Sequence, residues 1–280
     1  DCIMLSGETA NGKYPVEAVK TMSRIAEEAE KKLNYEASLK KKRKEHIPNV
    51  SNAISLAACN TAMELNASAI ITATQSGYTA KNVSKYRPEV PIIAVTPNEK
   101  VARRLALNWG VFPISATEFQ STDEMITESV NKAKEEGYVK NGDLVVVAAG
   151  IPVHYSGTTN MLKVHVVGDV LVQGKGAGSA PGFGNAKVIK NPKDAVKQVE
   201  KDDILIVKTL SKEYMEVLDR VPGIIAEEGG LTSHMAIECL SRGVPLIVNA
   251  GGATESIKTG TFITMDVARG VVYNGRANIV

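Results

Sequence analysis

The fold is decided by the stretch Glu228-Gly229-Gly230-Leu231-Thr232-Ser233-His234-Met235-Ala236-Ile237. Its histidine follows a paired-glycine turn and precedes an apolar, helix-forming run. The glycines let the backbone approach a bulky anion, and Thr232 and Ser233 offer hydroxyl and N–H donors where a helix begins. A neutral imidazole at such a turn can accept a phosphoryl group by nucleophilic attack. His234 is therefore a candidate phosphohistidine, and the alternative interpretation is an ordinary helix-start residue in an α/β domain.

Composition places the stretch in a two-domain α/β protein. The length of 280 residues suits two domains, and the apolar content of 44% is enough to build a core in each. Aromatic residues make up only 5%, while Ala, Val and Ile dominate, as expected for buried parallel strands covered by helices.

Charge and cysteine content narrow the class of protein. A net charge of +2 argues against a nucleic-acid partner. No apolar run is long enough to span a membrane, and no signal peptide is recognisable. The cysteines Cys2, Cys59 and Cys239 lie far apart without CxxC spacing, which favours reduced thiols over disulfides or a metal site. We therefore expect a cytoplasmic protein.

The middle of the chain alternates helix and strand. Periodicity predicts helices over 51–65, 80–86, 99–108 and 121–136, the last opened by a capping box at Ser121. It predicts strands over 69–73, 91–96, 111–115, 143–149 and 161–167. This alternation implies a doubly wound, mostly parallel sheet.

After Gly168 the pattern changes to a glycine-rich stretch, interpreted as a domain boundary and hairpin entry. Beyond it, strands are expected over 186–189, 204–207, 223–226, 245–249, 261–265 and 271–273. Helices are expected over 211–219 and 234–242. The sequence thus predicts a second, smaller domain of mixed β and α structure.

The first residues resemble a known signature. The run from Ile3 to Leu5 is typical of the end of a strand, and an amphipathic helix should follow from Pro15 to Leu33. The run Met4–Val19 resembles the MLSGETAxGxYPxEAV signature of the pyruvate kinase family, where it forms the last strand and helix of the (β/α)8 barrel. The resemblance implies that 1–30 is a barrel remnant, with Ser6 and Glu8 near the barrel site.

The resemblance also sets expectations for activity. The strand at residue 1 has no earlier partner, so we interpret the chain as a fragment of a longer protein. An intact enzyme would convert phosphoenolpyruvate and ADP to pyruvate and ATP in glycolysis, with Mg2+ and K+, as a cytoplasmic homotetramer. The family's phosphoenolpyruvate and metal residues would precede residue 1, so neither kinase activity nor a metal is expected in this chain alone.

The run Thr74-Gln75-Ser76-Gly77-Tyr78-Thr79 joins a strand to a helix and can present backbone N–H groups to a phosphate. It resembles the phosphate loop of the family's effector site, and the loop containing Gly157 and Thr158 resembles the loop that closes it. The resemblance implies an allosteric domain over 31–167, with Thr74, Gln75, Ser76, Gly77, Thr79, Gly157 and Thr158 on the effector phosphate. Because Gln75 stands where relatives that bind fructose bisphosphate often have Lys, we expect a sugar phosphate or AMP.

The tail resembles another module. Residues 174–184 resemble the GxxASPGxAxG entry of the phosphohistidine, or PEP-utilising mobile, domain, which implies such a domain over 168–280. That module usually has AxxAR after the histidine, whereas Arg242 is displaced by two positions, about 200° around a helix. Two alternatives to a regulatory role stay open: a phosphocarrier that uses His234, and a stand-alone oligomerisation or interaction module.

Overall fold

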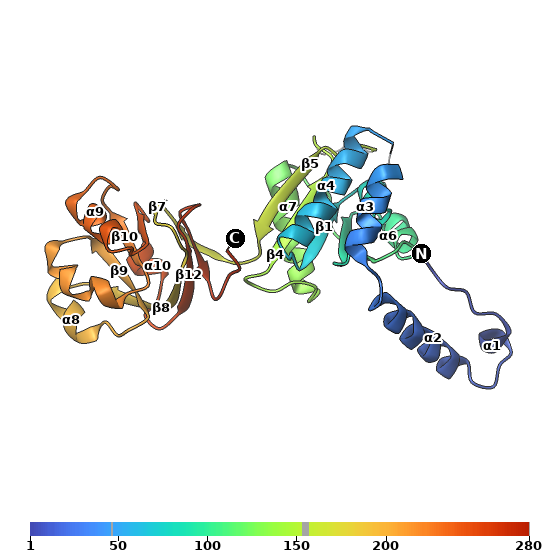
Figure 1. Ribbon diagram of the computed structural model, residues 1–280, viewed down its shortest axis with the longest axis horizontal. Helices are drawn as coiled ribbons and strands as arrows, with labels where there is room; N and C mark the ends of the chain where they lie inside the picture. Colours follow the sequence, from blue (N-terminus) through green and yellow to red (C-terminus); the bar gives the residue numbers. More distant parts are fainter. Residues whose placement is uncertain (46, 153–156, 280) are drawn as a thin grey trace. The chain divides into compact units, whose positions relative to one another are not determined.

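The computed structural model describes residues 1–45, 47–152 and 157–279 (Figure 1). The chain divides into two compact units. The first comprises Asp1–Tyr138 and Val145–His165, and the second comprises Val139–Leu144 and Val166–Val280. Among the described residues, no helix is both long and apolar enough to cross a membrane.

The first unit is built on a five-stranded sheet in the order β3-β2-β1-β4-β5. Its strands are β1 (Ala69–Ala73), β2 (Ile92–Thr96), β3 (Val111–Ser115), β4 (Leu144–Ala149) and β5 (Met161–Val166). The strand β1 runs parallel to β2 and β4, and β2 runs parallel to β3. Every residue of β1, β2 and β4 is buried, as a parallel sheet covered on both faces requires. The predicted doubly wound, mostly parallel architecture is confirmed.

The helices of this unit are α3 (Tyr35–Glu45), α4 (Val50–Glu64), α5 (Tyr78–Ser84), α6 (Glu99–Leu105) and α7 (Thr122–Glu135). Side chains from α3, α4, α5 and α6 share one core with Ile70 and Val146, while α7 packs against β1 and β2. The predicted cap of α7 is present, because Ser121 Oγ accepts a hydrogen bond from the Glu124 N–H at 3.2 Å. Glu124 accepts in return from Gln120 rather than from Ser121.

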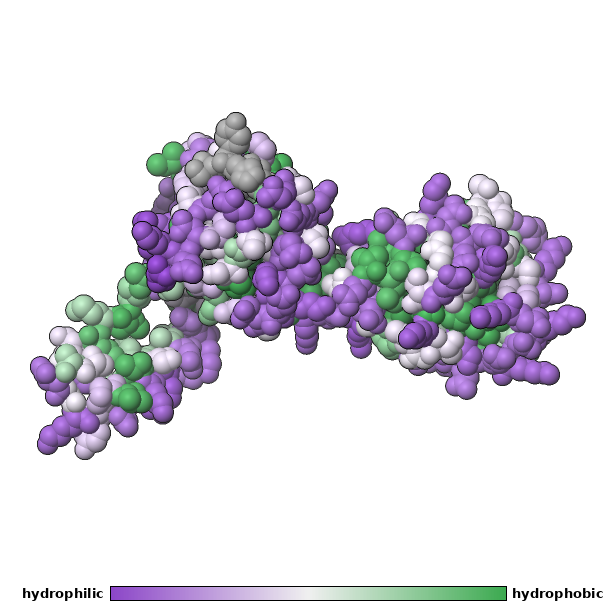
Figure 2. All heavy atoms as spheres, turned by 180° about the vertical axis from the view of Figure 1, so that it is seen from behind, coloured by the Kyte–Doolittle hydropathy of each residue, from purple (hydrophilic) through white to green (hydrophobic). Residues whose placement is uncertain are grey.

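The N-terminal segment differs from the prediction. It contains α1 (Gly7–Ala10) and α2 (Pro15–Glu30), but the expected strand at Ile3–Leu5 is absent. A strand needs a neighbour for its backbone hydrogen bonds, and the described part of the chain supplies none there. No residue of α2 is buried, and its apolar side chains lie on the surface, as Figure 2 shows for this segment.

The second unit is built on an eight-stranded sheet in the order β6-β13-β12-β8-β9-β10-β11-β7. Its strands are β6 (Val170–Gln173), β7 (Lys175–Ala177), β8 (Gly182–Ile189), β9 (Asp203–Thr209), β10 (Ile224–Glu228), β11 (Leu246–Val248), β12 (Phe262–Asp266) and β13 (Val271–Asn274). Its helices are η1 (Pro192–Asp194), α8 (Ala195–Gln198), η2 (Lys212–Arg220), α9 (His234–Ser241) and α10 (Ala253–Ser256). The mixed β and α character is confirmed, although η2 is a 3-10 helix.

The glycine-rich stretch forms two strands that the sequence did not predict. Only Gly174 separates β6 from β7, which are the two edge strands of the sheet, so the sheet curls until its edges meet. A side chain at Gly174 would place its Cβ 2.4 Å from the Val248 carbonyl oxygen, and one at Gly176 would lie 1.9 Å from that of Val267. Glycine is therefore required here by close backbone approach.

Candidate functional site in the first unit

The strand order of the first unit creates a position for a ligand. The chain moves outward from β1 through β2 to β3 and then returns to the other side of β1 as β4. The loops that follow β1 and β4 therefore diverge at the carboxyl ends of two neighbouring parallel strands. In open α/β sheets, ligands bind in the crevice at such a switch point.

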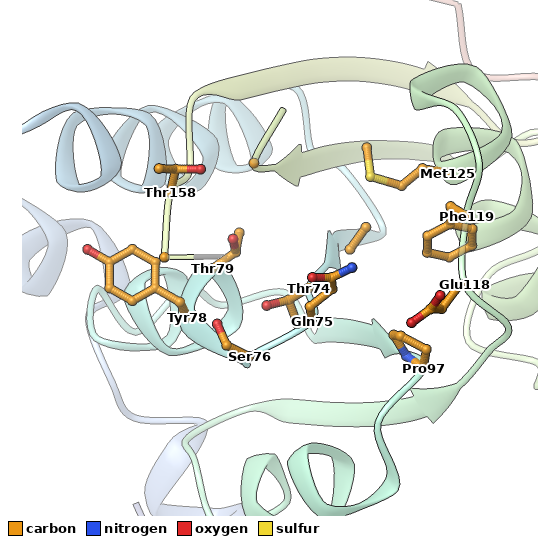
Figure 3. A pocket seen from close by; sticks show the side chains of 13 residues that line it. Thr74, Gln75, Ser76, Tyr78, Thr79, Pro97, Glu118, Phe119, Met125 and Thr158 are labelled. Atoms are coloured by element: carbon orange, nitrogen blue, oxygen red, sulfur yellow. The ribbon is translucent and has the colours of Figure 1, made fainter. Parts of the chain in front are cut away.

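A small cleft, with a cavity volume of about 40 Å³, lies at this switch point (Figure 3). Its walls come from residues at or after the carboxyl ends of the four parallel strands, from the start of α5 and from α7. The lining consists of Ala73, Thr74, Gln75, Ser76, Tyr78, Thr79, Pro97, Glu118, Phe119, Met125, Gly150, Gly157 and Thr158.

The turn after β1 is held by a hydrogen bond and a glycine. Thr74 Oγ1 accepts from the Gly77 N–H at 3.0 Å. Gly77 has a φ of +82° and precedes the first residue of α5, and a Cβ there would lie 3.1 Å from Leu105. This geometry leaves Ser76 exposed at the mouth of the cleft.

The loop after β4 is joined to the helices by side chains. The hydroxyls of Thr79 and Thr159 lie 2.9 Å apart, and the Thr159 N–H donates to Ser51 Oγ at 3.0 Å. Asn160 closes the loop, since its amide accepts from the Ile151 N–H at 2.8 Å and donates to the Ile151 carbonyl at 2.7 Å. The second wall is thus tied to α4 and α5.

The structure brings together the residues that the sequence proposed for a phosphate. Six of them line the one cleft, namely Thr74, Gln75, Ser76, Thr79, Gly157 and Thr158. Gly77 shapes the turn but is not part of the lining. The hydroxyls of Thr74 and Thr79 are buried and already hydrogen bonded, whereas those of Ser76 and Thr158 belong to exposed residues.

Sequence reasoning missed part of the lining, namely Tyr78, Pro97, Glu118, Phe119 and Met125. Pro97 directly follows β2, and Glu118 lies shortly after β3, so the parallel strand order was the signal that could have found them. Glu118 gives the cleft a carboxylate, and the described lining contains no Lys or Arg.

Ser6 and Glu8 do not line this cleft. They lie at the start of α1, where a Glu8 carboxylate oxygen accepts from the Ser6 N–H at 3.0 Å. The backbone N–H groups of Glu8 and Ser6 lower the pKa of the Glu8 carboxyl.

His234 is exposed and is the first residue of α9, where Ser233 Oγ caps the helix by accepting from the Ala236 N–H at 3.3 Å. Arg242 lies beyond the other end of α9. It donates through Nε to Glu238 at 2.9 Å and through a terminal nitrogen to Asp219 at 3.1 Å. The guanidinium is thus held by two carboxylates. Along the helix axis, Arg242 lies about 12 Å from His234.

The described residues contain no group of three or more His, Cys, Asp or Glu side chains placed to hold a metal ion. We derive no step through the Mg2+ or K+ that the resemblance implies for an intact enzyme.

Comparisons with known proteins agree with this arrangement. Residues 52–165 match the family "pyruvate kinase, alpha/beta domain", and 199–270 match "PEP-utilising enzyme, mobile domain". The whole chain is 45% identical to a pyruvate kinase of Bacillus licheniformis and 46% identical to one of Geobacillus stearothermophilus over 280 residues. It spans about half the length of these relatives, 48% in both cases.

A solved pyruvate kinase from Cryptosporidium parvum is also similar. It superposes with a TM-score of 0.55 at 35% identity, over 59% of this chain and 33% of that one. The whole chain is thus similar to part of these pyruvate kinases, and it matches their alpha/beta domain over 52–165 and a PEP-utilising mobile domain over 199–270.

Proposed function

We propose that the chain is the regulatory portion of a pyruvate kinase and binds a phosphorylated small molecule in the cleft of the first unit. The observation that carries this proposal is the convergence of two loops on one cleft at the switch point, joined by the hydrogen bond between Thr79 and Thr159.

The two ends of the cleft suit different parts of such a molecule. The turn 74–79 offers backbone N–H groups and the exposed Ser76 hydroxyl, and Thr158 offers another hydroxyl across the cleft. Each such contact contributes about 0.3–1 kcal/mol, so several must converge on the phosphate. Glu118 is an acceptor for ligand hydroxyl groups and opposes a second phosphate. A sugar monophosphate or AMP fits this pattern better than a bisphosphate.

Similarity to pyruvate kinases over the whole chain supports the activity that we propose for an intact enzyme. It would transfer phosphoryl between phosphoenolpyruvate and ADP, giving pyruvate and ATP in the cytoplasm, with Mg2+ and K+ bound outside this chain. The residues 1–30 would belong to its barrel, and the enzyme would be a homotetramer. Effector binding would act by tightening the link between the loops after β1 and β4.

Calorimetric titration of this chain tests the regulatory proposal. We expect ribose 5-phosphate, glucose 6-phosphate or AMP to bind, and the matching unphosphorylated compounds not to bind. Ser76→Asp places a negative charge at the phosphate position and should abolish binding, whereas Ser179→Asp, at an exposed serine of the second unit, should not. Unchanged binding in Ser76→Asp would place the ligand elsewhere and refute the assignment.

A phosphocarrier role is the second candidate. The mobile-domain match and the exposed His234 at the start of α9 favour it. In the transfer, an imidazole nitrogen would attack the phosphorus of phosphoenolpyruvate, the P–O bond would break, and the released enolate would take a proton to become pyruvate. Against this role, Arg242 is held by Glu238 and Asp219, whereas the arginine of this kind of domain usually lies closer to the histidine.

Labelling with radioactive phosphoenolpyruvate tests this candidate. Acid-labile, alkali-stable label that disappears in His234→Gln but persists in His165→Gln would support it. No label on the wild-type chain or on an intact enzyme would exclude it and leave the regulatory role unaffected.

A further inference from the structure

A second cleft, of about 510 Å³, lies in the second unit and shares no residue with the sites above. It is lined by residues 140–143, which precede β4, and by residues 274–276 and 278, which follow β13.

Backbone contacts fix the two walls relative to each other. Gly142 has a φ of +90°, and a Cβ there would lie 1.8 Å from the Arg276 carbonyl oxygen. The Asn278 N–H donates to the Gly142 carbonyl at 2.8 Å, and the Gly142 N–H donates to the Val167 carbonyl at 2.6 Å. The cleft is thus framed by backbone rather than by mobile side chains.

The charges of the cleft favour an anion. Lys140 and Arg276 are exposed, and within residues 1–45, 47–152 and 157–279 neither forms a salt bridge. The one carboxylate of the lining belongs to Asp143 and accepts the Lys140 backbone N–H at 2.9 Å. The described lining therefore holds two cations outside any printed ion pair and one carboxylate that already accepts a hydrogen bond.

An unpaired acceptor adds a second requirement. The side-chain oxygen of Asn141 is buried and has no hydrogen-bond partner among the described residues. Buried polar atoms are normally paired, so this oxygen has unused capacity to accept a hydrogen bond. Because Asn141 belongs to the lining, its amide is placed to accept from a hydroxyl that enters the cleft.

We propose that this cleft binds a small anion that also carries a hydroxyl group, such as a phosphate ester or a hydroxycarboxylate. Lys140 and Arg276 hold the anionic group, and Asn141 accepts from the hydroxyl. Occupancy would join the loop before β4 to the residues after β13, and the proposal is independent of effector binding in the first unit.

Titrations followed by backbone-amide NMR of the full chain test the proposal, with glycerol 3-phosphate, glycerate and sulfate as probes. We expect the amide signals of Gly142, Gly275 and Asn278 to shift when glycerol 3-phosphate or glycerate is added. The probe that binds more tightly shows whether the cleft prefers a phosphate ester or a hydroxycarboxylate. Signals of Gly77 report any binding in the first unit.

Variants assign the roles. Lys140→Gln with Arg276→Gln should raise the dissociation constant of the preferred probe about tenfold or more, whereas Lys201→Gln, an exposed lysine elsewhere in the unit, should not. Asn141→Ala should weaken the hydroxylated probe about fivefold and leave sulfate binding unchanged. The proposal would be overturned if the amide shifts persisted in the double variant. It would also be overturned if the wild-type chain and every variant responded equally to sulfate.

Discussion

The hydroxyl groups of Thr79 and Thr159 lie 2.9 Å apart, although the two residues are 80 positions apart in the chain. Both side chains are buried, and Thr159 is held further by the hydrogen bond from its N–H to Ser51. The pair connects the helix after β1 to the loop after β4, so it couples the two walls of the cleft.

Replacing one partner of this pair should be costly. In Thr159→Val the Thr79 hydroxyl stays buried without a partner, which costs about 1–3 kcal/mol. We expect that loss in the free energy of unfolding of the first unit, with weaker effector binding. Urea unfolding followed by fluorescence of Trp109, the single tryptophan of the chain, measures it.

Two further variants separate the hydrogen bond from changes in volume. The double variant Thr79→Val with Thr159→Val should be less destabilised than the sum of the single changes, since it leaves no unpaired hydroxyl. Thr232→Val, at an exposed threonine of the second unit, should leave the Trp109 transition unchanged. Additive losses in the double variant would show that the hydroxyls act separately.

Two glycines in the loops at the cleft give a matched comparison. Gly77 and Gly157 have φ values of +82° and +89°. An added Cβ would press on Leu105 at Gly77, whereas at Gly157 it would meet no atom of the described residues within 4 Å. Gly157→Ala should therefore cost about 1–2 kcal/mol from backbone strain alone, and Gly77→Ala should cost more. If urea unfolding showed equal losses of unfolding free energy in the two variants, the Leu105 side chain would be able to move away from the new methyl group without cost.

The sequence predicted the doubly wound unit because its strands are uninterrupted apolar runs between periodic helices. It also singled out the turn 74–79, from its residue types together with the resemblance, and the structure places this turn at the cleft. Local residue patterns did not identify Glu118 or Phe119, because these reach the cleft only through the order in which parallel strands pair. Proximity of this kind depends on topology and leaves no local pattern.

The errors have a similar origin. Ile3–Leu5 has strand-like residues but no neighbouring strand among the described residues, so the local preference is not realised. Conversely, β7 is the short glycine-containing segment Lys175–Ala177, whose strand is imposed by its antiparallel partner β11. In both places, pairing rather than composition decides the outcome.

The buried thiol of Cys239 predicts a loss of stability at high pH. Burial raises the pKa of this thiol from 9.0 to about 11. Between these values the unfolded chain loses the proton and the folded chain keeps it, so stability falls as pH rises, by up to about 2–3 kcal/mol. Denaturant unfolding of the second unit at pH 8 and pH 10.5 should show a smaller difference in Cys239→Ala, whereas Cys2→Ala, at an exposed thiol, should retain the wild-type difference.

Closure of the second sheet depends on the absence of a side chain at Gly174. This residue joins the two edge strands, its N–H donates to the Gly270 carbonyl at 2.8 Å, and a Cβ would lie 2.4 Å from the Val248 carbonyl oxygen. Because the obstacle is backbone on β11, it cannot move without breaking the pairing of β11 with β7. We expect Gly174→Ala to destabilise the second unit by about 3 kcal/mol or more, measured by calorimetry, and to leave the Trp109 transition of the first unit in place.

The matched control for this substitution is Gly260→Ala. Gly260 has a φ of +88° with nothing within 4 Å of an added Cβ, so this variant carries backbone strain without a collision. Its cost should be about 1–2 kcal/mol. If Gly174→Ala lost no more stability than Gly260→Ala, the edge strands β6 and β7 would have room to separate. Closure through Gly174 would then contribute little to the stability of the second unit.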